Sequence, residues 1–221
     1  MLQSQFKVNT VTEIFSYIKA IESPLSADVA FIKTKECTWI FDTGACLEAR
    51  QAIEEIEGPK YVVISHFHED HISNVPLIKY DRMFGGKNTA GYVPLTDIIT
   101  ERTAFDDIEL IPVASSHAKG CLLMKAGRYL FLGDATYASE KNGMRCYNVQ
   151  KLKEMLDTLK GIDAQYFCLS HDRRFIRPKE SIILLLEHIY SKKKNNESWI
   201  YLTADHVITS CQTQLCFIPT Y

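Results

Sequence analysis

Five short apolar runs in this chain end alike, with an aspartate or a histidine directly behind the run. The runs CTWIF, KYVVIS, IPVASS, RYLFLG and FCLS lead into Asp42, His66, His117, Asp134 and His171. Runs of this type predict strands. A serine precedes each of the three histidines, where a small side chain tolerates crowding. The pattern constrains the fold, because sheets must then bring polar side chains from several strand ends to one place.

Three stretches between these strands carry apolar residues at helical spacing. Leu47–Glu57 ends before a Gly-Pro pair, Val149–Lys160 ends before a glycine, and Pro178–Tyr190 begins with proline. Proline in the first turn and glycine behind the last are helix boundary signals. Strands alternating with helices predict an α/β fold in which helices cover the sheets. No Pro/Gly/Ser-rich linker divides the chain, so we expect residues 1–221 to form one domain.

The segment from Cys121 to Leu132, CLLMK-AG-RYLFL, is typical of a β-hairpin with Ala126-Gly127 at its turn. If the turn lies at one end of the hairpin, the residues that flank the two strands meet at the other end. We therefore expect His117, before the first strand, to lie beside Asp134, after the second.

The densest polar cluster is HFHEDH at 66–71, directly after the apolar run KYVVIS. On a helix His66 and Asp70 would share a face while His68 would point elsewhere. In a tight turn after a strand, the side chains at 66, 68, 70 and 71 can converge. Imidazole and carboxylate groups suit a borderline metal such as Zn²⁺, so the cluster indicates a metal site. Glu69, inside the cluster, is expected to be solvated.

Taken in order, these motifs resemble the signature of the metallo-β-lactamase superfamily. The matching elements are Asp42 in FDTG, HFHEDH at 66–71, His117, Asp134 in LGD and His171 in LSHD. The resemblance spans residues 25–172, approximately. It implies a four-layer αββα sandwich with the site along one edge of the two sheets.

The resemblance also implies two divalent ions, with Zn²⁺ favoured and Mn²⁺ or Fe²⁺ as alternatives. By the family pattern one ion is held by three histidines, the other by three further residues, and one aspartate bridges them. These groups are His66, His68 and His117, then Asp70, His71 and His171, with Asp134 as the bridge. Asp42 is expected to accept a hydrogen bond from a ligand histidine. Its alternative role is a helix N-cap before ACLEAR.

The implied reaction is hydrolysis, in which a metal-bound hydroxide attacks a carbonyl ester of a small metabolite. Asp134 stands where true β-lactamases of this fold commonly have cysteine, and His68 where the oxygen-reducing di-iron branch has glutamate. Tyr137, three residues after Asp134, resembles the Asp-x-x-Tyr of quorum-sensing lactonases, whose tyrosine contacts the substrate. Asp70, Asp134 and Tyr137 are therefore the candidate catalytic residues, and lactones or thioesters the favoured substrates. The lactonase Gly-Gly after HxDH is Ile72-Ser73 here.

Two alternatives remain open. A phosphodiesterase or nuclease is the first, because HDRRFIRPK places a basic cluster beside the last ligand histidine. Arg173, Arg174, Arg177 and Lys179 could bind a carboxylate or phosphate, or form a solvated approach to the next helix. The second alternative is a non-catalytic metal-binding protein on the same fold.

The composition of the chain indicates which kinds of binding partner are expected. The chain is 46% hydrophobic and 24% charged with a formal net charge of −2, so it favours neither nucleic acid nor an anionic membrane as a partner. No apolar run reaches the ~18–20 residues that span a bilayer. Seven scattered cysteines and no visible export signal predict a cytoplasmic protein. The implied hydrolase reaction predicts a small-molecule substrate. The apolar segment 198–221 either completes a sheet or covers a partner such as a second copy in a homodimer.

Overall fold

The computed structural model describes residues 15–20 and 26–202. Most of its strands form two six-stranded sheets, and a small third sheet lies beside the second. The first sheet has the strands in chain order: β1 (Ser16–Ile18), β2 (Val29–Lys33), β3 (Thr38–Phe41), β4 (Lys60–Ile64), β5 (Arg82–Gly85) and β6 (Asp97–Ile98).

The second sheet has a crossed order, β14-β13-β10-β9-β8-β7. Its strands are β7 (Thr103–Phe105), β8 (Ile108–Val113), β9 (Cys121–Ala126), β10 (Tyr129–Gly133), β13 (Tyr166–Leu169) and β14 (Ile176–Pro178). The third sheet joins β11 (Ser139–Lys141), β12 (Met144–Asn148) and β15 (Trp199–Tyr201).

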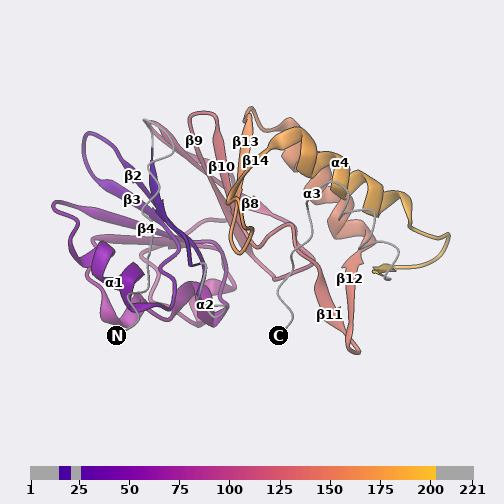
Figure 1. Ribbon diagram of the computed structural model, residues 1–221, viewed down its shortest axis with the longest axis horizontal. Helices are drawn as coiled ribbons and strands as arrows, with labels where there is room; N and C mark the ends of the chain where they lie inside the picture. Colours follow the sequence, from indigo (N-terminus) through magenta and orange to yellow (C-terminus); the bar gives the residue numbers. More distant parts are fainter. Residues whose placement is uncertain (1–14, 21–25, 203–221) are drawn as a thin grey trace.

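Helices cover the outer face of each large sheet (Figure 1). The helices are α1 (Leu47–Glu54), α2 (Glu69–Ile72), α3 (Val149–Gly161) and α4 (Lys179–Ser191), with the short 3₁₀ turns η1 (Val75–Leu77) and η2 (Thr89–Gly91). The three helices expected from periodicity are α1, α3 and α4, each displaced by at most a few residues at its ends. Within the described residues, no helix is long and apolar enough to cross a membrane.

Three apolar clusters separate four layers. On β4, Val62 and Ile64 pack toward α1 with Ile53, whereas Val63 packs between the sheets with Phe131. This alternation is the period-2 pattern of a strand that is covered on both faces. The third cluster lies between the second sheet and the pair α3 and α4. The predicted αββα sandwich is therefore confirmed.

The hairpin of β9 and β10 forms as expected, with one difference in its turn. Ala126 is still paired with Tyr129, so the turn residues are Gly127 and Arg128 rather than Ala126 and Gly127. The SWIYLT run is β15, which pairs with β12. The remainder of segment 198–221, from 203 onward, lies outside the described residues.

Candidate metal centre

The strand ends predicted to carry ligands meet at one edge of the two large sheets. Asp42 directly follows β3, Asp134 directly follows β10, and His171 comes two residues after β13. His66 comes two residues after β4, and His117 lies in the loop between β8 and β9. The chain then turns at His68 into the four-residue helix α2, which carries Asp70 and His71.

The first group consists of His66, His68 and His117, which offer ring nitrogens within 4.8 Å of one another. Nδ1 of His68 lies 3.0 Å from Nε2 of His117. Nε2 of His66 is buried and has no hydrogen-bond partner among the described residues. Three imidazoles whose ring nitrogens lie this close together are suited to hold a cation.

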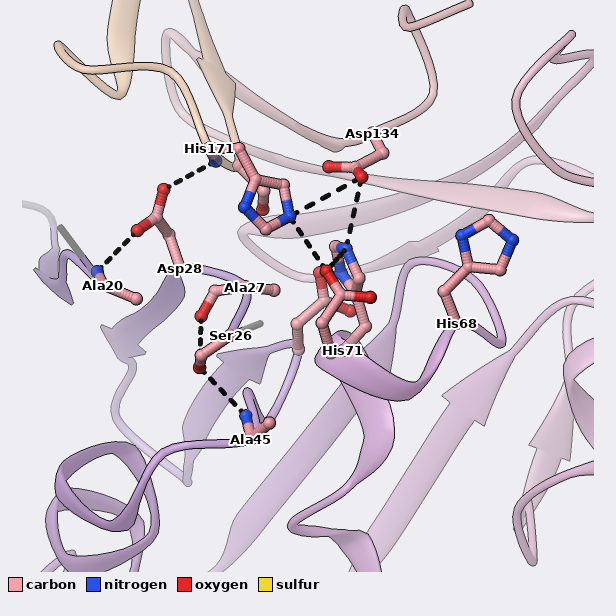
Figure 2. A network of polar contacts seen from close by, with 12 residues as sticks. Ala20, Ser26, Ala27, Asp28, Ala45, His68, His71, Asp134 and His171 are labelled. Atoms are coloured by element: carbon pink, nitrogen blue, oxygen red, sulfur yellow. Dashed lines mark hydrogen bonds and ion pairs between the residues drawn. The ribbon is translucent and has the colours of Figure 1, made fainter. Parts of the chain in front are cut away.

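The second group consists of Asp70, His71, Asp134 and His171. Nε2 of His171 lies 2.9 Å from Oδ2 of Asp70 and 3.7 Å from Oδ2 of Asp134. Nε2 of His71 is 3.4 Å from Oδ2 of Asp70 and 3.5 Å from Oδ2 of Asp134. Figure 2 shows His71, Asp134 and His171 converging from separate segments of the chain.

Asp134 lies between the two groups. Its Oδ2 is 3.4 Å from Nε2 of His117 in the first group and 3.5 Å from Nε2 of His71 in the second. Among the described atoms, Oδ1 of Asp134 and Nε2 of His71 are buried without a hydrogen-bond partner, like Nε2 of His66. Buried polar atoms normally have partners, and cations at these positions would supply them. The side chains therefore fit two divalent ions.

Charge is distributed unevenly between the groups. Burial, together with the other histidines, lowers the pKa of His66 well below its usual value, and burial also lowers the pKa of His68. Neutral imidazole is the form that binds a metal. In the second group, burial disfavours a charged His71, but the carboxylates of Asp42 and Asp134 outweigh burial and raise its pKa well above the usual value. Burial also disfavours a charged His171, but the hydrogen bond to Asp70 and the charges of Asp134 and Asp70 together outweigh burial and raise its pKa.

Asp42 holds His71 from behind. Its side chain is fully buried, and Oδ2 accepts a hydrogen bond from Nδ1 of His71 at 2.8 Å. Oδ1 accepts the backbone N–H of Ser65 at 2.8 Å. A carboxylate on Nδ1 fixes the tautomer and leaves Nε2 for a ligand bond. The alternative of a helix N-cap is wrong, because Cys46 is the N-cap residue of α1.

Ser65 does more than tolerate crowding. Its hydroxyl oxygen lies 3.0 Å from Nδ1 of His66 and 3.2 Å from Nδ1 of His71. It therefore contacts one imidazole of each group, a role that the sequence analysis missed. The serine before a motif histidine was the available signal, but spacing alone does not show which way a hydroxyl points.

Tyr137 lies beside the centre, with its ring centroid 6.5 Å from that of His117. Its hydroxyl donates a hydrogen bond to the carbonyl oxygen of Ser170. Burial, with the nearby Asp134 charge, raises the pKa of Tyr137 well above its usual value. The side chain is therefore a neutral donor that is engaged with the backbone. Glu69 is exposed, as expected for a residue outside the ligand set.

The basic cluster after His171 is partly used for structure. Arg177 is buried and pairs with Asp172 through Nε and Nη2 at 3.0–3.1 Å. Nζ of Lys179 donates to the carbonyl oxygens of Lys160 and Ile162. Arg173 and Arg174 are exposed.

Asp28 and Lys19 also support the site, although no pattern in the sequence points to them. Oδ2 of Asp28 accepts the backbone N–H of His171 at 3.0 Å and the ammonium of Lys19 at 2.6 Å. Both side chains of this ion pair are buried, with exposed fractions of 6% for Lys19 and 1% for Asp28. No spacing rule connects these residues with a histidine 143 positions away.

The family model described as the metallo-beta-lactamase superfamily matches residues 23–85. This range contains the FDTG and HFHEDH motifs. The later motif residues His117, Asp134 and His171 lie outside the matched range but belong to the two groups. The matched part of the chain is similar to the metallo-β-lactamase superfamily. This similarity agrees with the two groups as candidate metal-binding residues. No curated protein sequence matches the chain significantly.

Solved structures support the same fold. The metallo-β-lactamase FIM-1 from Pseudomonas aeruginosa, in its mono-zinc form, matches with a TM-score of 0.66 and 14% identity over 85% of this chain and 95% of its own. VMB-1 at pH 5.5 matches with a TM-score of 0.64 and 16% identity, covering 85% and 97%. The chemotaxis sensor ODP, as a peroxy diiron species, gives 0.60 and 12%, covering 82% and 93%. Identities this low show the fold alone.

Proposed function

We propose that this protein is a hydrolase that uses two divalent cations, with Zn²⁺ favoured, to cleave the carbonyl ester bond of a small metabolite, a lactone or a thioester. The observation that carries the proposal is the position of Asp134. Its Oδ2 lies 3.4 Å from a nitrogen of the first group and 3.5 Å from a nitrogen of the second. A carboxylate in that position suits a bridge between ions that lie ~3.5–4 Å apart in two-metal sites.

When bound, such ions supply a water of lowered pKa as nucleophile and polarise a carbonyl oxygen. The chain supplies the proton acceptor. Burial favours the neutral form of Asp70, but the hydrogen bond from His171 and the charges of His71 and His171 together outweigh burial. They hold the pKa of Asp70 below its usual value, so Asp70 is an ionised carboxylate. Its side chain is 25% exposed, which lets water and substrate reach it. Asp70 can therefore take a proton from the attacking water and return it to the leaving atom, which is oxygen in a lactone and sulfur in a thioester.

Tyr137 has a narrower place in this mechanism. Because its pKa is raised well above the usual value, it can act as a hydrogen-bond donor but not as a base. To contact a substrate carbonyl or leaving oxygen, its hydroxyl must first release the carbonyl of Ser170. We propose that Tyr137 contacts the substrate after its hydroxyl exchanges the carbonyl of Ser170 for a substrate oxygen.

The charges around the site favour a small carbonyl ester over a nucleic acid as the substrate. Two of the four basic side chains near His171, those of Arg177 and Lys179, are engaged with Asp172 and with backbone carbonyls. The chain has a net charge of −2. Nucleic-acid binding normally relies on several cations arranged along the phosphate backbone. Phosphodiester hydrolysis is the second candidate, favoured by the exposed Arg173 and Arg174 behind His171.

We propose that the protein acts in a reducing compartment, the cytoplasm. The structure supports this through its cysteines. The described cysteines are all free thiols, and four of them are buried: Cys37, Cys121, Cys146 and Cys168, with Cys46 half-buried. Buried free thiols behave as small apolar side chains, and disulfides are rare where the cytosol keeps thiols reduced.

The test is a substrate panel on protein that is first stripped with a chelator and then loaded with Zn²⁺ or Mn²⁺. Lactones, glutathione thioesters, a chromogenic phosphodiester and a β-lactam would be assayed side by side. We expect turnover of a lactone or thioester that is lost on chelation and restored by metal. Turnover of the phosphodiester alone would replace the proposal with the second candidate. Two bound ions without turnover in any class would indicate a non-catalytic protein.

A histidine outside the site provides the matched control. His188 lies on α4, and His188→Ala removes an imidazole of the same chemistry without touching either group. We expect it to retain both metal content and turnover, whereas His68→Ala loses both. Full activity of the rigorously metal-free wild-type protein would contradict the proposal.

A further inference from the structure

The buried segment Ser26–Asp28, which leads into β2, lies against the second candidate metal group. We call it the 26–28 clamp. Its hydrogen bonds reach three parts of the chain that are far apart in the sequence (Figure 2). These are the loop before α1, the helix α2 and the loop after β13, and each of them carries a residue that belongs to or supports the second group.

Asp28 forms the contact with the loop after β13. Its Oδ2 accepts the backbone N–H of His171 at 3.0 Å, and its Oδ1 accepts that of Ala20 at 2.9 Å. Nζ of Lys19 donates to the same Oδ2 at 2.6 Å. One buried carboxylate thus binds three donors, and one of them is the backbone of a candidate metal ligand.

The other two residues complete the clamp. The N–H of Ala27 donates to the carbonyl oxygen of Asp70 at 2.9 Å. Oγ of Ser26 accepts the N–H of Ala45 at 2.9 Å, in the loop that begins with Asp42. The three residues of the clamp therefore bind the backbones of two candidate ligands, Asp70 and His171. They also bind the loop that carries Asp42, the hydrogen-bond partner of His71.

The backbone of His171 needs such support. Its φ is +63°, in the left-handed region that residues other than glycine seldom occupy. A residue persists there when its surroundings over-determine its conformation. The hydrogen bond from its N–H to Asp28 supplies that constraint, and it directs the imidazole toward Asp70 and Asp134.

We infer that the 26–28 clamp positions the second metal group, and that Asp28, balanced by Lys19, sets the affinity of that group through the backbone of His171. The inference rests on the two-ion site of the proposed function. Among the described residues, none of the clamp's hydrogen bonds reaches the first group. Asp28 is thus a positioning residue that acts on one half of the centre.

The test measures the two ions separately. Protein is equilibrated with Zn²⁺ buffers of increasing free concentration, and bound zinc per chain is determined by elemental analysis. Asp28→Ala is expected to leave the first binding step unchanged and to raise the dissociation constant of the second by about 10–100-fold, the range for lost partners of metal ligands. The melting temperature of the metal-free protein is measured in parallel.

A double variant separates positioning from stability. Asp28→Ala leaves Lys19 as an uncompensated buried charge, whereas Lys19→Met with Asp28→Ala removes the charge as well. We expect the double variant to recover melting temperature while its second step stays weak. Recovery of both would show that Asp28 is merely structural and would overturn the inference. If Asp28→Ala alone does not fold, the double variant decides.

Further outcomes are also informative. Asp97→Asn, which weakens the half-buried pair with Arg82, is the control and should change neither zinc step. Equal weakening of both zinc-binding steps in Asp28→Ala would overturn the inference. A wild-type protein that binds a single ion would also overturn it, but would leave a hydrolase function intact. Selective loss of the second ion in a protein without turnover would support the clamp and refute the proposed function.

Discussion

Gly133 provides a sharp test of the packing behind the metal centre. It is the last residue of β10, directly before Asp134, and its φ is +53°. A Cβ at this position would lie 2.6 Å from Oγ and 2.7 Å from Cβ of Ser65. Ser65 contacts His66 and His71. Gly133→Ala therefore strains the backbone and pushes against the residue that contacts both metal groups.

The expected cost has two parts. A side chain in the left-handed region costs about 1–2 kcal/mol, and overpacking of a filled interior costs about 1–3 kcal/mol. We expect Gly133→Ala to lower the free energy of unfolding by about 2–5 kcal/mol in total. Gly143 is the matched control, because its φ is +71° and nothing lies within 4 Å of the added Cβ. Gly143→Ala should cost only the first part, about 1–2 kcal/mol.

The assay is urea unfolding of the metal-free proteins, followed by determination of bound zinc after reloading. Gly133→Ala should also bind zinc less tightly, since Ser65 cannot move without disturbing two imidazoles. Ser65→Gly removes both atoms of the overlap, so adding it to Gly133→Ala should cost less than the sum of the single changes. Equal destabilisation by Gly133→Ala and Gly143→Ala, with unchanged zinc binding, would refute this reasoning.

Three further predictions concern single groups. Tyr137→Phe should lower the free energy of unfolding by about 1–3 kcal/mol, because the carbonyl of Ser170 loses its donor. A fall in kcat on accepted esters would support the proposed substrate contact of the hydroxyl, and unchanged turnover would refute it. His71 and His171 have raised pKa values in the metal-free protein, so binding of the second ion should release protons and weaken as pH falls. Calorimetry in buffers of different ionisation enthalpy measures this release, and identical heats in all buffers would contradict it. Glu69→Ala should keep the full metal content by elemental analysis, because Glu69 is exposed, and loss of one equivalent would show that it is a ligand.

The fold was largely predictable because its signals are periodic and local. Each strand of the β9–β10 hairpin is apolar, a glycine marks the turn, and the pairing then brings His117 and Asp134 together, 3.4 Å apart at their closest. Helices α1, α3 and α4 follow from a spacing that leaves one apolar face for a sheet. The turn position was wrong by one residue, since Ala126 still fits the strand and the pairing continues through it.

The supports of the site were much harder to predict. Asp28 contacts a backbone N–H 143 residues away, and a contact with a backbone group places no demand on the identity of the residue that donates it. Lys19 belongs to no recognisable sequence motif. Ligand residues are recognisable because the metal requires their side chains, whereas the residues that hold the ligands are required only by the geometry of the folded chain.

The bridging position of Asp134 follows from the strand order of the second sheet. β10 lies between β9 and β13, so the residue behind β10 has the loop before β9 on one side and the loop after β13 on the other. Those loops carry His117 and His171, the two second-sheet histidines of the separate groups. In the first sheet β3 lies beside β4 in parallel, which places Asp42 behind the turn that carries His66 and His71. Asp134, which follows β10, can therefore reach both groups. Asp42, which follows β3, instead binds Nδ1 of His71 and leaves Nε2 for a ligand bond.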